Sequence, residues 1–158
     1  YTPPDFPEPD EPRLGGRVAV AADVKIGDRL VRLYSVHFES TLSALRIRDA
    51  QAVEIASDGA DLAYPVIAGG DLNSFFATLD FQNGSRNDGT TQAFFTRGYR
   101  DAHANLPLAA RDTIFDPVPL IIDFILVRNA EILGAGLCPR DRCGDLSDHL
   151  PVWAHIGL

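Results

Sequence analysis

The sequence predicts a single α/β domain built on a mixed β-sheet with flanking helices, and three observations support this prediction. The chain has 158 residues, of which 46% are hydrophobic and 23% charged, a composition typical of one folded domain with a sizeable core. Two apolar runs separated by a glycine-containing turn predict an antiparallel hairpin. A helical stripe then lies between two strand-like runs, as in a crossover unit whose strands are neighbours in the sheet.

The first residues are expected to form an extended arm or the end of a linker. Residues 1–12 hold five prolines among several acidic residues, a composition that disfavours both helix and β-ladder. Ordered structure should begin near Gly15 and Gly16. The expected division is therefore an arm over residues 1–15 and one domain over residues 16–158.

The hairpin is expected over residues 18–24 and 30–37, with Gly27 in the turn. Alternation along the second strand puts His37 on the same face as Val31. The hairpin therefore carries a polar, ionisable residue to the end of a core strand.

A helix is expected over residues 42–56, because its apolar positions fall on one stripe. Ser40 or Thr41 can serve as its N-cap, and Gly59 can end it. A buried strand over residues 66–69 follows, which completes the crossover unit.

Residues 74–91 are rich in Asn, Asp and Gly and predict a surface loop, with one helical turn around residues 75–79. Thr90 or Thr91 is expected to cap a short helix that runs through Arg97. Loops of this length in compact domains often carry function.

Three further strands are expected: over residues 120–127, over residues 131–137, and after the triplet 147–149 at the end of the chain. Asp123 stands in the middle of the first of these apolar runs. A carboxylate is costly to bury in a strand unless a donor or a cation pairs with it. Asp123 therefore needs a partner.

The two cysteines, Cys138 and Cys143, leave two interpretations open. They are close enough in sequence for a small-loop disulfide in an oxidising compartment, and they could equally remain reduced thiols. Two cysteines without a nearby histidine do not make a zinc site.

The net charge of −8 argues against an extended basic groove for non-specific nucleic-acid binding. It is compatible with a phosphate-bearing substrate held through a divalent cation, because clustered carboxylates concentrate such cations. No apolar run reaches the length of a membrane span, and no signal peptide is recognisable.

The polar tip of the strand over residues 66–69 is the clearest candidate for chemistry. Asp71 and Asn73 have the same parity, so they point to the same side if the extended geometry persists. A carboxylate beside an amide offers an acceptor for a proton or cation and a donor for an oxyanion. The alternative is an ordinary Asx-turn that leaves the strand without any chemistry.

Polar residues stand at or near the ends of core strands in four segments, and each alone has a structural explanation. His37 could be a satisfied histidine at a strand edge, and Asp148 an ordinary turn residue. Their joint occurrence is harder to explain, because burying several charged groups in one small core is costly unless they serve one another. The set is His37, Asp71, Asn73, Asp123, Asp148 and His149.

These residue types suggest hydrolysis of a phosphate ester. Asp123 could orient a histidine through one ring nitrogen, and His149 is the better partner because it adjoins another carboxylate. Asp148 would help to hold a divalent cation, which polarises the phosphoryl oxygen. Asp71 would orient or deprotonate the attacking water. Two further residues, Asn73 and His37, would donate to the non-bridging oxygens.

Five motifs closely resemble, in order, the second-half motifs of the endonuclease/exonuclease/phosphatase superfamily, which has the DNase I-like fold. They are His37-Phe-Glu-Ser40, Arg48-x-x-Gln51, Gly70-Asp71-Leu72-Asn73-Ser74, Ile122-Asp123-Phe124-Ile125 and Ser147-Asp148-His149. The resemblance runs from about Gly16 to the C-terminus. Single motifs are weak, but five in the correct order with strand context are strongly specific.

The resemblance implies half or more of a four-layer α/β/β/α sandwich, with a phosphoesterase site at the sheet ends that uses Mg²⁺, or Mn²⁺ or Ca²⁺. By this analogy His149 is the catalytic histidine, with Asp123 as its orienting carboxylate and Asp148 as a metal ligand. Asp71 and Asn73 form the water and phosphate group, and His37 is a phosphate contact. Arg48 and Gln51 are supporting positions.

One departure from the family concerns its first half, which contributes an Asn and a Gln-Glu pair whose Glu is a principal metal ligand. No counterpart of either is found in this chain. A fragment of a longer hydrolase is the favoured explanation, since the chain contains no Met; a separate chain or a truncated non-catalytic relative are the others. A half-domain would expose apolar surface, which favours pairing with the missing N-terminal half or a homodimer.

The expected function is a divalent-metal-dependent hydrolase of phosphate esters: a phosphodiesterase, a nuclease or a phosphatase. Its substrate would be a nucleic acid, a phospholipid head group or a small phosphorylated metabolite. The alternative is a non-catalytic binding or assembly module that retains the DNase I-like scaffold. A third interpretation is a purely structural α/β domain whose polar residues are turn caps.

Overall fold

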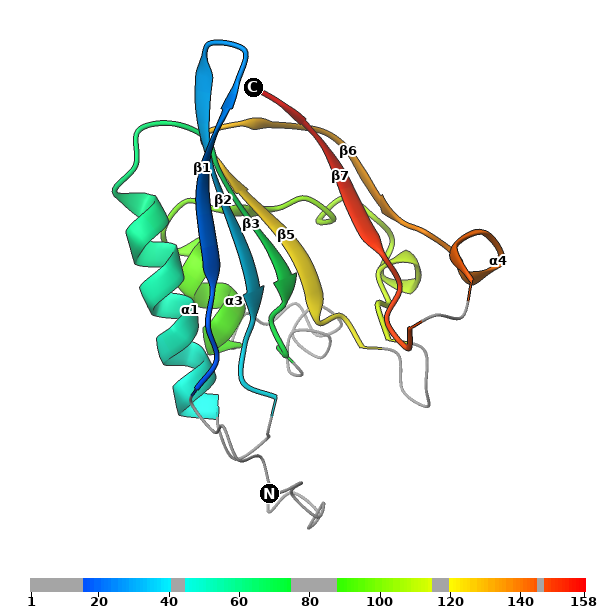
Figure 1. Ribbon diagram of the computed structural model, residues 1–158. Coiled ribbons are helices and arrows are strands. Elements are labelled where there is room, and N and C mark those ends of the chain that lie inside the picture. Colours follow the sequence, from blue (N-terminus) through cyan, green and yellow to red (C-terminus); the bar gives the residue numbers. More distant parts are fainter. Residues whose placement is uncertain (1–15, 41–44, 75–87, 115–119, 145–146) are drawn as a thin grey trace.

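The structure is a computed structural model that describes residues 16–40, 45–74, 88–114, 120–144 and 147–158 (Figure 1). Several sequence predictions lie outside these residues: the arm over residues 1–15, most of the surface loop over residues 74–91 with its helical turn around residues 75–79, the N-cap at Thr41 and the helix start at residue 42. The division into an arm and a domain stays a prediction.

The main sheet has five strands in the order β1-β2-β3-β5-β4. The strands are β1 Val20–Ile26, β2 Arg29–His37, β3 Val66–Asp71, β4 Arg100–Asp101 and β5 Asp123–Arg128. β1 and β2 form the antiparallel hairpin, with Gly27 at a positive φ in its turn. β2 and β3 pair in parallel, whereas β5 is antiparallel to both β3 and β4. The predicted mixed sheet and its crossover unit are confirmed.

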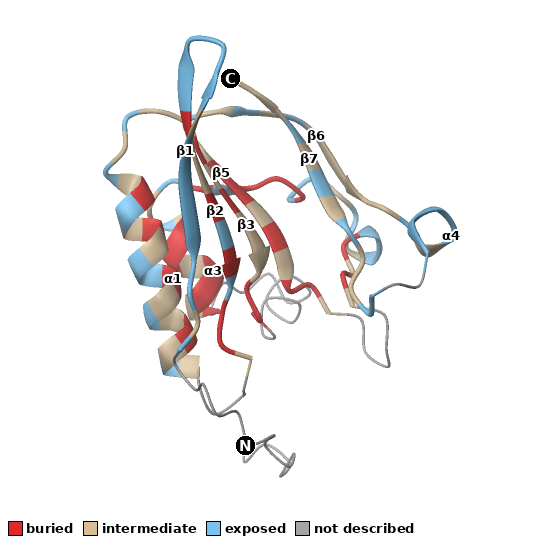
Figure 2. Ribbon diagram, viewed as in Figure 1, coloured by how far each residue is buried: buried red, intermediate tan, exposed pale blue. Residues whose placement is uncertain are grey.

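Helices α1 (Leu45–Ala60) and α3 (Gly89–Phe95) lie side by side on one face of this sheet (Figure 1). The core lies between them and the sheet, where the inward side chains of β2 and β3 are buried (Figure 2). Phe94 of α3 packs edge to face against Tyr99 at a ring-centroid distance of 5.2 Å. None of the described helices is long and apolar enough to cross a membrane.

Three predicted helix boundaries were wrong, one of them the end of α3, which lies at Phe95 rather than at Arg97. Gly59 does not end α1, because the helix continues to Ala60 and buries Gly59 against Val66 of β3. Asp88, rather than Thr90 or Thr91, caps α3, since its carboxylate accepts a hydrogen bond from the Thr91 N–H at 3.0 Å.

A second sheet pairs β6 (Glu131–Leu137) with β7 (Val152–Gly157) in antiparallel fashion. It faces the main sheet on the side away from the helices (Figure 1). A cleft of about 390 Å³ between them is lined by side chains of both sheets, including Ile67 and Ile125 on one side and Ala154 and Ile156 on the other. The described residues thus form a helical layer and two facing sheets, as expected for half or more of a four-layer sandwich.

Two short helices, the 3₁₀ helix Leu108–Ala110 and α4 (Arg140–Cys143), lie in the connections. A disulfide joins Cys138, just after β6, to Cys143 at the end of α4. Of the two interpretations that the sequence left open, the structure therefore contains the disulfide.

Gly70 occupies a backbone position that other residues adopt only with strain, and this predicts a large effect of its substitution. Its φ is +143°, and a Cβ would overlap the carbonyl oxygen of Val36 and lie 2.9 Å from the carbonyl carbon. We expect Gly70→Ala to lower the free energy of unfolding by about 2–5 kcal/mol, measured by urea denaturation.

The adjacent Gly69→Ala is the matched control, because its Cβ would have no neighbour closer than 3.7 Å. It should change the free energy of unfolding by less than about 1 kcal/mol. Equal effects of the two substitutions would contradict the argument from Gly70.

Candidate active site

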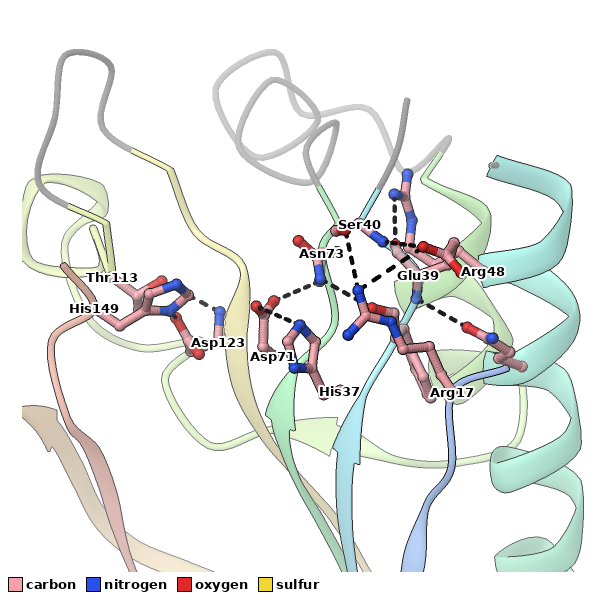
Figure 3. Close-up of polar contacts among 12 residues, drawn as sticks. Arg17, His37, Glu39, Ser40, Arg48, Asp71, Asn73, Thr113, Asp123 and His149 are labelled. Carbon is pink, nitrogen blue, oxygen red and sulfur yellow. Dashed lines mark hydrogen bonds and ion pairs between the residues drawn. The ribbon is translucent and has the colours of Figure 1, made fainter. Parts of the chain in front are cut away.

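The register of the main sheet brings three ionisable residues together at one edge. His37 at the end of β2 is the pairing partner of Asp71 at the end of β3, and Asp71 is the partner of Asp123 at the start of β5. Paired residues of adjacent strands project to the same face. Three segments that are far apart in sequence therefore present their side chains side by side (Figure 3).

His149 reaches this edge from the segment that leads into β7. Its Nδ1 lies 2.8 Å from Oδ2 of Asp123, which is the contact predicted from the sequence. An ionised carboxylate only accepts hydrogen bonds, so Nδ1 carries the proton and Nε2 faces away from the carboxylate. Asp123 is the first residue of β5 and not its middle, so this partly buried carboxylate stands at the sheet edge.

The carboxylates around His149 raise the pKa of its imidazole above the ordinary value of 6.5. Burial alone acts to lower this pKa, since it disfavours the charged ring. The hydrogen bond that His149 donates to Asp123 and the negative charges of Asp123, Asp71 and Asp148 together outweigh burial. His149 therefore holds its second proton to a higher pH than an isolated histidine.

The two carboxylate oxygens of Asp71 make different contacts: one belongs to the turn after β3, and the other lies near His37. Its Oδ1 accepts a hydrogen bond from the N–H of Asn73 at 2.8 Å, which is the Asx-turn of the alternative interpretation. Its Oδ2 lies 3.6 Å from Nε2 of His37. Burial raises the pKa of Asp71, and the charge of Asp123 adds to this rise, while the hydrogen bond from Asn73 and the two histidines oppose it.

Asn73 departs from the expected geometry. The chain leaves the strand after Asp71, and Asn73 adopts a left-handed conformation with φ +48°, so the extended alternation does not persist. Its amide is buried and donates from Nδ2 to the carbonyl of Phe38 at 3.0 Å, which ties the end of β3 to the end of β2. Nδ2 has a second hydrogen beyond this contact.

The remaining two predicted residues are exposed. The imidazole of His37 is 56% exposed beside Asp71. Asp148 is exposed next to His149 and acts on it through its charge. In the described part of the chain, the group whose atoms could hold one metal ion is instead Asp71, Asp123 and His149, with ligand atoms within 4.8 Å of one another.

Glu39 and Arg48 are buried behind the site and hold its backbone in place. The carbonyl of Glu39, two residues after β2, accepts a hydrogen bond from Arg48 at 3.3 Å, and its N–H donates to Gln51 at 3.0 Å. Arg48 also donates to Thr90 of α3. Both supporting positions on α1 thus hold the backbone that follows His37.

Thr113 is a site residue that the sequence did not reveal. Its hydroxyl contacts the backbone of Asp123, and its neighbour Ile114 pairs with His149. A threonine in a polar loop carries no pattern that would have singled it out.

The comparisons with known proteins show the family and the fold of this chain. The sequence pattern of the Endonuclease/Exonuclease/phosphatase family matches residues 2–149. No curated protein sequence matches the chain.

Solved structures with the same fold cover most of this chain. A humanized D. rerio TDP2 with 14 mutations has 19% identity and a TM-score of 0.71, covering 90% of this chain and 61% of that one. An endonuclease/exonuclease/phosphatase from Beutenbergia cavernae DSM 12333 has 20% identity and a TM-score of 0.72, covering 90% and 39%. A mannosyl-6-phosphatase of Bacteroides thetaiotaomicron VPI-5482 has 18% identity and a TM-score of 0.63, covering 90% and 57%.

This chain thus spans less than two thirds of each of these three proteins. At such low identities the likeness shows the fold, whereas the family pattern extends over nearly the whole chain. By that match, the chain belongs to the endonuclease/exonuclease/phosphatase family.

Proposed function

We propose that this protein is a divalent-metal-dependent hydrolase of phosphate esters. The observation that carries the proposal is the pair of His149 and Asp123 at 2.8 Å, with the carboxylate of Asp71 beside it. An imidazole oriented by one carboxylate next to a second carboxylate is an acid and base arrangement suited to hydrolysis.

His149 would act on the phosphoryl group through Nε2. With Nδ1–H held by Asp123, the raised pKa keeps the ring protonated at higher pH, so that Nε2–H can donate to an oxygen where charge develops. Asp71 would orient or deprotonate the attacking water, and its raised pKa makes it a stronger base than an ordinary carboxylate.

The non-bridging oxygens would be held by His37 and Asn73. The exposed imidazole of His37 is open to a ligand on the Asp71 side of the site. Asn73 contributes the second hydrogen of Nδ2, because the first is held by the carbonyl of Phe38. The fixed position of that amide avoids the cost of ordering it when the substrate binds.

The donor set around Asp71 fits a hard divalent cation, with Mg²⁺, Mn²⁺ or Ca²⁺ as the candidates. Carboxylate oxygens of Asp71 and Asp123 lie within 4.8 Å of each other, and Asp148 would add an exposed carboxylate, while both nitrogens of the protonated His149 ring are kept for hydrogen bonds. Such a cation, when bound, supplies Lewis-acid polarisation of the phosphoryl oxygen. In the family a further carboxylate comes from the Glu of a Gln-Glu pair, which has no counterpart in this chain.

The substrate class rests on the shared chemistry of the fold's members. A D. rerio TDP2 structure holds a single-strand DNA product, and the B. thetaiotaomicron protein is a mannosyl-6-phosphatase. DNA contains phosphate esters, and a phosphatase acts on one, so we infer a phosphate ester as the substrate class of this chain. The net charge of −8 favours a small phosphorylated substrate over long nucleic acid for this chain.

Pairing with another polypeptide is a further part of the proposal. Large apolar side chains are exposed at the β1–β2 hairpin and on the second sheet: Val18, Val20, Ile26, Leu30, Leu133 and Trp153. Exposed apolar surface of this kind favours association. Activity is therefore to be assayed both for the chain alone and for the chain joined to any residues that are encoded upstream of it.

The function is tested with bis-p-nitrophenyl phosphate and p-nitrophenyl phosphate in the presence of Mg²⁺ or Mn²⁺. We expect hydrolysis that EDTA abolishes, because the site then lacks its cation. His149→Ala should lower kcat by about 10²–10⁴-fold, whereas His155→Ala, on an exposed position of β7, should leave kcat unchanged. The absence of metal-dependent hydrolysis, both in this chain and in the chain with any residues encoded upstream of it, would favour the non-catalytic binding module.

A further inference from the structure

We propose that Thr113 is a positioning residue that holds Asp123 and His149 in the geometry of their hydrogen bond. This inference rests on the proposed function, in which that pair is the acid and base. Thr113 belongs to the connection between the 3₁₀ helix and β5, and Figure 3 shows its side chain beside the pair.

The hydroxyl of Thr113 uses its full hydrogen-bonding capacity at the start of β5. Its Oγ1 accepts from the N–H groups of Ile122 and Asp123, each at 3.2 Å. It donates to the carbonyl of Leu120 at 3.3 Å. A hydroxyl has one donor and two acceptor positions, and Thr113 is 1% exposed, so water cannot replace these contacts. This one oxygen therefore holds the N–H groups at the start of β5, in addition to the pairing of Asp123 with Asp71 of β3.

The main chain of Thr113 holds the segment that carries His149. Its carbonyl accepts from the N–H of Leu150 at 2.8 Å, and the next residue, Ile114, forms a β-bridge with His149. Asp123 and His149 are 26 residues apart in sequence. Thr113 thus contacts both segments directly.

Thr113 is itself anchored to the main sheet. Arg111, two residues earlier, is buried and forms an ion pair with Asp101, the last residue of β4. Asp101 also accepts from the N–H of His103 at 2.9 Å. Because the ion pair of Arg111 with Asp101 fixes the segment that carries Thr113, the hydroxyl can determine the position of Asp123.

Removing the hydroxyl while keeping the side-chain shape separates positioning from packing. Thr113→Val would leave the N–H groups of Ile122 and Asp123 without this acceptor. The backbone hydrogen bonds of Thr113 would remain: its N–H donates to the carbonyl of Leu120 at 2.9 Å, and its carbonyl accepts from Leu150. The start of β5 can then shift relative to His149. Thr113→Ser keeps the oxygen and is the matched control.

The experiment reads the tautomer of His149 from ¹⁵N NMR of the metal-free protein, at a pH where the ring is neutral, so no turnover is required. We expect the native protein and Thr113→Ser to hold the Nδ1–H form, and Thr113→Val to show a mixture of both tautomers. In the active protein, Thr113→Val should lower kcat by about 10–100-fold with KM within about 3-fold, and Thr113→Ser should restore most of kcat.

An unchanged tautomer and kcat in a folded Thr113→Val protein would overturn the proposal, even if its melting temperature falls. If the valine variant does not fold, Thr113→Ala, which adds no bulk, decides the question by the same readings. A changed tautomer in a protein that hydrolyses no phosphate ester would uphold the positioning role and refute the proposed function.

Discussion

Replacing Asp123 with asparagine is expected to lower kcat by about 10³–10⁴-fold while KM changes by less than about 5-fold. The Asn amide can present either its oxygen or its NH₂ to Nδ1 of His149. The NH₂ group would favour the tautomer with Nδ1 unprotonated, a neutral ring whose Nε2–H is a weaker donor and acid than that of the imidazolium. The loss of the negative charge also destabilises the imidazolium form.

The same substitution should lower the pKa of His149, because the hydrogen bond to Asp123 and the charge of Asp123 are the largest effects that raise this pKa. An NMR titration of the His149 ring in the metal-free protein measures this shift. Asp28→Asn, at a fully exposed turn position, is the control and should change neither kcat nor this pKa. A variant that keeps native kcat and an unshifted His149 would show that Asp123 does not orient the ring.

Much of the fold could be predicted because its signals are local. The Gly27 turn defines the hairpin, and strand–helix–strand succession defines the parallel pairing of β2 with β3. Helix ends were less predictable, since they depend on packing. Gly59 reads as a helix end, yet here its missing side chain allows α1 to pack against β3.

The pairing of Asp123 with His149 could be predicted because a carboxylate in an apolar run demands a partner. The left-handed turn at Asn73 could not, since parity arguments assume that the strand continues. Thr113 was missed for a different reason. Its function comes from where its backbone and hydroxyl lie in space, and its residue type is common in loops.

Asp71→Asn is expected to abolish most activity and to stabilise the protein at neutral pH. Loss of the carboxylate removes the group that would orient or deprotonate water, which should cost about 10²–10⁴-fold in kcat. The amide oxygen can still accept the hydrogen bond from Asn73, so the turn after β3 should persist. Activity and stability therefore change in opposite directions.

The pH dependence of that stability gain distinguishes the charge of Asp71 from other causes. Because the folded pKa of Asp71 is raised above its ordinary value of 3.8, its contribution to stability is fully present below that value and is lost as the pH rises through the raised pKa. At pH 7 the ionised carboxylate thus destabilises the fold, whereas an asparagine stays neutral.

Thermal unfolding in EDTA should give a higher Tm for Asp71→Asn at pH 7, by about 2–4 °C for each kcal/mol gained. The difference should vanish near pH 3, while the Asp28→Asn control should show no such dependence. A stability gain equal at both pH values would mean that Asp71 is not held in a charge-disfavouring site, and the argument for its enhanced basicity would fail with it.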